Sequence, residues 1–255
     1  MKKVCCFLVC LLWGQSLLFA FPAEFPLEVG KYAIWRGVRA YHQSAEGARI
    51  DTLQKQEFFL RVAVVGKEIV KERRKRKTKQ VYYWVEYNLS SEPSQWEGGQ
   101  SLKVRIHEED LKKGVFPKGE VEYILQMGKT TPTRQVADFS SEFSLFWPLL
   151  VLSPPYSLSK TEIGKEKFRT HLQEGEGTIF LYRGENVQKS EIAEKTEKVT
   201  GKTLLFPGIP FGVVWLQAVY EDMLLIGKEN PRKMVMVVNL QLEQVGENAQ
   251  SEVTG

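Results

Sequence analysis

The chain has no cysteine after its tenth residue. Its three cysteines, Cys5, Cys6 and Cys10, all lie in an apolar N-terminal segment. A chain without cysteine forms no disulfide, offers no thiolate metal ligand and has no thiol nucleophile, so the domain that follows must be held together by its core alone. A lipid-attachment cysteine would stand at the end of the apolar run, and Cys10 comes too early for that. We therefore expect a mature protein that is soluble, without disulfides and without a lipid anchor.

Motifs of catalysis and cofactor binding are also missing. The three histidines, His42, His107 and His171, are far apart and show no metal-ligand spacing. Two Gly-Lys-Thr triplets lack the earlier glycine of a phosphate loop, and no serine occupies a Gly-x-Ser-x-Gly elbow. The cluster His107-Glu108-Glu109-Asp110 directly follows an alternating strand, which favours a solvated strand end over a catalytic pair. We expect no catalytic residue, no metal and no cofactor, and hence a protein that is not an enzyme.

A strong charge of one sign is absent as well. The net charge is +4, which gives no global field for nucleic acid, and no nucleic-acid partner is expected. The exception is one basic run, which contains Lys71, Arg73, Arg74, Lys75, Arg76, Lys77 and Lys79. It is interpreted either as a patch for phosphates or partner proteins or as a solvated loop between two strands. We favour the loop, because so many like charges cannot lie together in a dry environment.

Residues 1–20 have the layout of a secretory signal peptide. A basic start at Lys2 and Lys3 precedes an apolar run, and the small residue Ala20 closes it. Ala23 is a second candidate for the cleavage site. An uncleaved membrane anchor is the alternative, but the segment falls short of the ~20 apolar residues that a spanning helix needs. The sequence therefore predicts a periplasmic or secreted protein.

Alternating patterns predict that residues 21–246 form a single domain built mainly of strands. Residues 102–106 alternate apolar and basic side chains, which is typical of a half-buried strand. Gly66-Lys67 gives a turn signal after a strand that is apolar on both faces. Roughly ten such strands without repeating strand–helix units predict the mainly β (α+β) class, with a curved antiparallel sheet as a half-barrel or incomplete barrel. Residues 247–255 are polar and are expected to be a flexible tail.

One segment changes to a helical period and predicts a helix over residues 135–150. Its aromatic band consists of Phe139, Phe143, Phe146 and Trp147, and Pro148 should kink or end the helix. Such a helix must lie against an apolar surface. It is interpreted either as a plug that fills the concave face of the sheet or as a mobile lid over a hydrophobic ligand.

The longest nearly uncharged run after the N-terminus is Leu204–Tyr220, which combines two prolines and two glycines with an apolar strand. The prolines stop strand pairing before the strand begins. Because this strand is apolar on both faces, one face can line a cavity. Together with the aromatic helix it gives the candidate cavity residues Phe139, Phe143, Phe146, Trp147, Phe211, Val213 and Trp215.

The C-terminal third carries a family resemblance. Residues 163–166 (Ile-Gly-Lys-Glu), 177–180 (Gly-Thr-Ile-Phe), 207–214 (Pro-Gly-Ile-Pro-Phe-Gly-Val-Val) and the ending at 242–246 occur in this order. They resemble a widespread group of uncharacterised bacterial secreted proteins, which is similar to the LolA/LppX half-barrel carriers. The resemblance implies a curved antiparallel sheet and a helical lid around a cavity for acyl chains. It implies no catalytic residue.

These observations lead to two functional hypotheses. The first is a non-enzymatic periplasmic or envelope protein that binds a hydrophobic ligand, a lipid or a lipoprotein acyl chain, in a half-barrel cavity. The second is a structural or interaction module of the cell envelope with a filled core and no ligand, whose partners are envelope proteins.

Overall fold

Eleven long strands carry nearly all of the regular structure. In the computed structural model, the described residues are 28–44, 54–71, 79–96, 99–113, 120–138, 158–189, 193–226 and 232–253. The strands are β1 (Tyr32–Ser44), β2 (Gln54–Lys71), β3 (Lys79–Ser90), β4 (Gln100–His107), β5 (Glu120–Met127), β6 (Thr133–Asp138), β7 (Leu158–Arg169), β8 (Glu174–Lys189), β9 (Ala193–Leu205), β10 (Val213–Ile226) and β11 (Arg232–Gly246). Among these residues the single helix is α1 (Glu108–Lys113). The prediction of a mainly β protein is confirmed.

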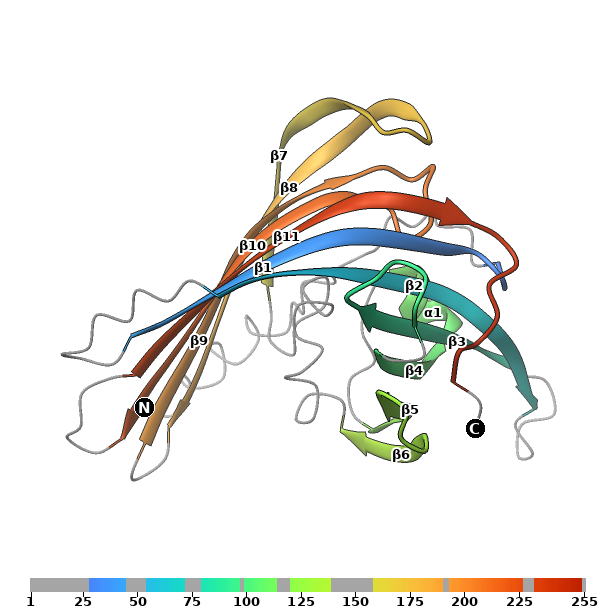
Figure 1. Cartoon of the computed structure of the whole chain (residues 1–255), viewed down its shortest axis with the longest axis horizontal. Coiled ribbons are helices and arrows are strands. Elements are labelled where there is room, and N and C mark those ends of the chain that lie inside the picture. Colours follow the sequence, from blue (N-terminus) through green and yellow to red (C-terminus); the bar gives the residue numbers. More distant parts are fainter. Residues whose placement is uncertain are drawn as a thin grey trace, which may run out of the picture.

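All eleven strands belong to one antiparallel sheet in the order β6-β5-β4-β3-β2-β1-β11-β10-β9-β8-β7 (Figure 1). The first and last strands pair in the middle, from Tyr32 opposite Gly246 to Ser44 opposite Lys233. We call β1–β6 the N-terminal wing and β7–β11 the C-terminal wing. In the described part of the chain no pairing joins the edge strands β6 and β7, so the sheet is open.

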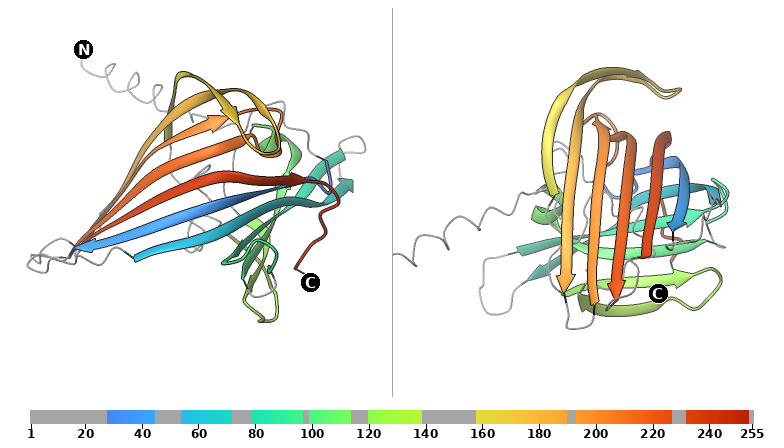
Figure 2. Two further views of the ribbon diagram at one scale, coloured as in Figure 1. Left: turned by 45° about the horizontal axis from the view of Figure 1, so that its top comes forward. Right: turned by 90° about the vertical axis from the view of Figure 1, so that its left-hand side faces the viewer.

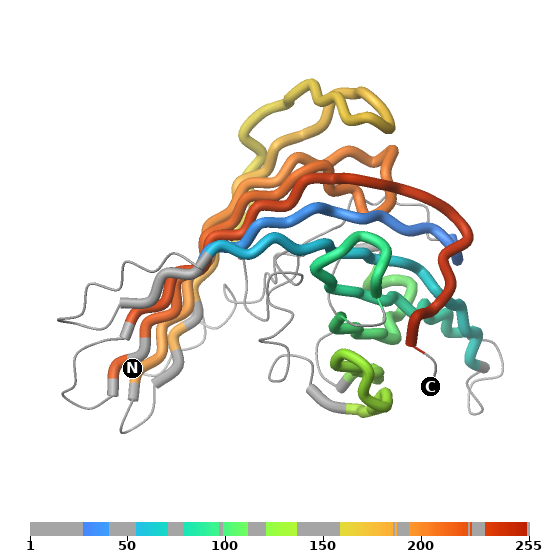
Figure 3. The backbone as a smooth tube through the Cα atoms, in the orientation of Figure 1, coloured from blue at the N-terminus to red at the C-terminus, as the bar shows by residue number. Residues whose placement is uncertain are grey.

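The sheet is strongly twisted and bent. Strands β3–β6 run crosswise to β7–β11, and the β7–β8 hairpin bends over at one end (Figures 2 and 3). Register shifts mark β-bulges in four strand pairs, including one between Val64 and Gly66 where β2 pairs with β3. The predicted turn at Gly66-Lys67 is wrong, because the bulge lets β2 continue as one strand to Lys71.

The two faces of the sheet differ in composition. On one face, which we call the core face, lie most side chains of the main apolar cluster, among them Ala33, Trp35, Leu60, Val62, Val85, Tyr87, Leu102, Val104, Leu216, Val238 and Leu240. The opposite or reverse face carries the alternate residues, such as Arg36 and Val38 on β1 and Gln217 on β10. The core face is thus continuous from one wing to the other.

One glycine on the core face is required by close packing. Gly37 on β1 lies directly opposite Phe58 on β2. A Cβ atom on Gly37 would approach the Phe58 ring to 2.3 Å, far inside van der Waals contact. The missing side chain therefore gives Phe58, which is 2% exposed, its place in the core.

The predicted helix over residues 135–150 is wrong at its start. Residues 133–138 form β6, which pairs with β5 from Leu125 opposite Thr133 to Glu120 opposite Asp138. Four residues that were assigned to the first helical turn are therefore part of the sheet edge. The remainder of the predicted helix, with Phe139, Phe143, Phe146 and Trp147, lies outside the described residues.

Candidate functional site

The structure places the predicted cavity residues that it describes on both faces of the sheet, each of them in or against the apolar cluster. Phe211 and Val213 belong to the core-face cluster, and each is 2% exposed. Trp215 lies on the reverse face, where it pairs with Leu204 and Gln241 and is half-buried. The bulge between Val213 and Trp215 sets this arrangement, and the core face of β10 continues with Leu216.

The turn from Phe206 to Gly212 anchors the C-terminal wing to β1. Phe211 has a positive φ of 61°, which is unusual for a bulky side chain, and its ring lies edge-on to Trp35 at 6.4 Å between centroids. The Trp35 indole Nε1 donates a hydrogen bond of 2.9 Å to the Val213 carbonyl oxygen. Two of the predicted cavity residues therefore already have partners in the core.

A groove of about 860 Å³ crosses the reverse face. It is lined by residues from both β2 and β7, which lie six positions apart in the strand order. A flat sheet could not bring these strands to one hollow, so the bend of the β7–β8 hairpin makes the reverse face concave here (Figure 2). The apolar lining includes Val38, Ile163, Ile179 and Trp215, and Ile163 is 47% exposed. This volume lies in the range of small-molecule sites.

Charged groups of both signs stand around the groove. They are Arg36, Lys202, Glu57, Glu166 and Glu243. The Arg36 guanidinium donates a hydrogen bond of 2.9 Å to the Glu57 carboxylate. This hydrogen bond, and then the opposite charge, lowers the pKa of Glu57 below its ordinary value. The same hydrogen bond raises the pKa of Arg36, so both groups stay charged at neutral pH.

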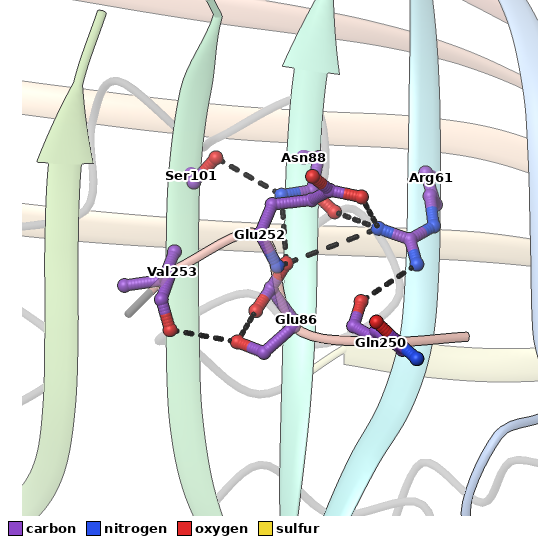
Figure 4. A network of polar contacts seen from close by, with 8 residues as sticks. Arg61, Glu86, Asn88, Ser101, Gln250, Glu252 and Val253 are labelled. Carbon is purple, nitrogen blue, oxygen red and sulfur yellow. Dashed lines mark hydrogen bonds and ion pairs between the residues drawn. The ribbon is translucent and has the colours of Figure 1, made fainter. Parts of the chain in front are cut away.

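A second polar site lies on the reverse face of the N-terminal wing (Figure 4). Glu86 is fully buried, and its carboxylate accepts hydrogen bonds from Asn88 Nδ2 at 3.0 Å and from the Glu252 backbone N–H at 2.9 Å. Ser251 Oγ donates to the other carboxylate oxygen at 2.5 Å. Arg61 Nη1 lies 3.9 Å from the same carboxylate. A buried charge of this kind is tolerated because it is paired and hydrogen-bonded.

The C-terminal segment completes this polar site. Arg61 donates to the Gln250 carbonyl oxygen at 3.0 Å and to the Glu252 carboxylate at 3.2 Å. Ala249 N–H donates to the Gly30 carbonyl oxygen at 2.8 Å, and Val253 is 1% exposed. Residues 247–253, for which a flexible tail was predicted, are instead hydrogen-bonded across β2 and β3 (Figures 1 and 4). The partners Arg61 and Glu86 lie far away in sequence, which is why composition alone gave no signal.

The histidines do not come together. His107 ends β4, where its Nδ1 accepts a hydrogen bond from the Glu109 backbone N–H at 3.3 Å, while His171 lies exposed in the β7–β8 turn at the other side of the sheet. His42 is on β1. Among the described residues no group of three or more His, Cys, Asp or Glu side chains could hold a metal ion.

The basic run is placed between two paired strands. Lys71 ends β2 and lies opposite Lys79, which begins β3. Residues 72–78, with Arg73, Arg74, Lys75, Arg76 and Lys77, stand between these two strands in the sequence and are outside the described residues. The interpretation of the run as an inter-strand loop stays a prediction.

Comparison with known proteins gives no assignment. No protein-family model matches the chain, and a search of curated proteins found no match. Within the described residues no helix is long and apolar enough to cross a membrane. The function must therefore be argued from the sequence and from the two faces of the sheet.

Proposed function

We propose that this protein is a non-enzymatic binding protein of the bacterial cell envelope, which holds a hydrophobic ligand against the core face of its open sheet. One observation carries the proposal: a single apolar cluster extends along the core face across both wings, from Tyr123 on β5 to Tyr182 on β8. An apolar surface of this extent is covered either by the chain's own residues or by a ligand, and a lipid or lipoprotein acyl chain is a chemically suitable ligand.

Three further features support this proposal. The N-terminal signal pattern favours export to the periplasm. The bent, open sheet is compatible with a half-barrel, and the aromatic residues at 139–147 are the proposed lid or plug. The C-terminal resemblance points to the LolA/LppX carriers, and it motivates the choice of an acyl chain as the ligand.

A second candidate is an envelope interaction module with a filled core. The observation in its favour is the low exposure of the core face: Trp35, Phe211 and Val213 are each 2% exposed, so other groups of the protein already cover them. In that case the basic run at 71–79 is the proposed contact with an envelope partner.

A volume-adding substitution separates these candidates. Ala218 is 2% exposed on the core face of β10, and its neighbour Val219 is 37% exposed on the reverse face. We would express Ala218→Phe and the matched control Val219→Phe, purify both from the cell envelope, and identify co-purified lipids by native mass spectrometry. Unfolding by urea would be measured in parallel.

The ligand hypothesis predicts that lipid co-purifies with the parent protein and with Val219→Phe, and that Ala218→Phe loses it while staying folded. A filled core predicts no lipid in any sample and a loss of about 1–3 kcal/mol in Ala218→Phe, which is typical of overpacking. This second result would overturn the binding function. Neutral replacements in the basic run, followed by pull-downs from the envelope, then test the interaction module.

A further inference from the structure

The groove on the reverse face presents polar side chains in an ordered array. Register places Val38, Asn239, Gln217 and Lys202 in one row across β1, β11, β10 and β9. Arg36, Gln241 and Trp215 form the neighbouring row, two residues further along each strand. With strands about 4.8 Å apart, the first row extends over roughly 14 Å. The groove can therefore contact an elongated ligand at several points.

Three amide groups at the centre of this array are free to bind a ligand. The side chains of Gln217, Asn239 and Gln241 are exposed, and within the described residues they have no hydrogen-bond partner. Each amide offers both donors and an acceptor. An acyl chain laid here would remove these groups from water without compensation, which is costly. The groove therefore suits a ligand with many donors and acceptors of its own.

The charges of the groove disfavour an anionic ligand. Three carboxylates and two cations line it, and the guanidinium of Arg36 is already paired with Glu57 at 2.9 Å. A phosphate or carboxylate ligand would meet Glu166 and Glu243 with only Lys202 unpaired among the described cations of the groove. An uncharged ligand meets no such repulsion.

Trp215 supplies the apolar part of the site. It is half-buried between Gln241 and Leu204 in the sheet, and in the described part of the chain its indole N–H donates no hydrogen bond. An aromatic side chain of this kind presents an apolar body and one donor. We propose that the groove binds an uncharged oligosaccharide, with a sugar ring against Trp215 and its hydroxyl groups hydrogen-bonded to Gln217, Asn239 and Gln241.

This inference concerns the face opposite to the proposed lipid surface, so the two can fail independently. The test uses the full mature chain and the uncharged probes maltotriose, cellotriose and chitotriose, with binding measured by calorimetry and by saturation-transfer NMR. Trp215→Ala should raise the dissociation constant of a bound probe by roughly tenfold or more. The double variant Gln217→Ala with Asn239→Ala should weaken binding of that probe as well.

Trp84→Ala is the matched control. Trp84 is also a half-buried tryptophan on the reverse face, but it lies on β3 and does not line the groove. The Trp84→Ala variant should bind the probe with unchanged affinity, and circular dichroism should show all variants folded. The inference is overturned if none of the three probes binds, or if Trp84→Ala and Trp215→Ala have the same effect. It is also overturned if octanoate, but no sugar, loses affinity in Trp215→Ala.

Discussion

At the scale of single residues, Glu86 is a buried carboxylate that depends on its hydrogen bonds and on a nearby positive charge. Its side chain is fully buried, and its carboxylate is held by Asn88, Ser251, the Glu252 backbone and the nearby Arg61. A carboxylate accepts at both oxygens, whereas an amide accepts at one and donates at the other position. Conversion to an amide therefore disrupts several contacts at once.

We expect Glu86→Gln to lower the free energy of unfolding by about 3 kcal/mol, because a buried pair loses one partner. Urea denaturation followed by tryptophan fluorescence measures the change. Glu57→Gln is the control, since Glu57 also pairs with an arginine but lies exposed, and it should change stability little. Equal losses in the two variants would contradict the importance that we assign to burial.

The Arg36–Glu57 pair predicts a pH dependence. The hydrogen bond from Arg36 lowers the pKa of Glu57, so the pair contributes stability above the ordinary pKa of a glutamate. That contribution is lost as the pH falls through the lowered pKa. NMR titration of the Glu57 carboxyl carbon should give a midpoint below that of free glutamate, and Arg36→Gln should return it upward. An unchanged midpoint in Arg36→Gln would refute the assigned cause.

At the scale of elements, residues 248–253 of the C-terminal segment lie across the N-terminal wing and are hydrogen-bonded to it. Deletion of residues 248–255 removes four hydrogen bonds from Arg61 and Glu86. We expect a loss of about 3–5 kcal/mol, because buried charge is left without compensation. Hydrogen exchange should quicken in β2–β4 more than in β8–β10. An equal increase of the exchange rates in β2–β4 and in β8–β10 would show that the segment does not stabilise the N-terminal wing locally.

Local patterns predicted the strands better than their connections. The alternation of Leu102, Val104 and Ile106 with basic residues gave β4 because one face of that strand is core and the other is not. Gly66 suggested a turn, but a glycine also suits a bulge, and only the partner strand β3 decides between them. The start of the predicted helix failed for the same reason, since residues 133–138 gain a partner in β5.

The candidate sites could be predicted from the sequence less well than the strands. The groove takes one to four residues from each of seven strands, so no short window contains its signal. The polar cluster joins Arg61 and Glu86 to residues more than 160 positions away. Phe211 and Val213 were recognisable as apolar, but the bulge that sends Trp215 to the reverse face depends on pairing with β9. Pairing between distant strands thus decides on which face such a side chain lies, and the periodicity of the sequence leaves this open.

At the scale of the whole molecule, the sheet is an up-and-down meander whose first and last strands lie in the middle of the strand order instead of at its edges. β7–β11 followed by β1–β6 would be a simple up-and-down series, and the present chain instead joins its two ends by the β1–β11 pairing. Pairings distant in sequence slow folding because loop closure precedes their contacts.

A circular permutant tests this reasoning. Residue 253 would be joined to residue 28 by a Gly/Ser linker, and the chain would be opened between β6 and β7, within residues 139–157. The β1–β11 pairing then becomes local, and we expect faster refolding with similar stability, measured by stopped-flow fluorescence and urea denaturation. Refolding at the parent rate would show that this pairing does not limit folding.

The β1–β11 pairing is present in the folded protein but cannot form while the chain is still being synthesised. In the folded protein the sheet ends at β7, where Glu162, Lys165, Glu166 and Lys167 are all exposed and charged side chains discourage pairing with other molecules. Until β11 has been synthesised, however, the edge is β1, with Ala33 and Trp35 on its uncovered core face. A ribosome adds the missing partner last of all the strands. We therefore expect the polypeptide to be most prone to aggregate before β11 has paired with β1.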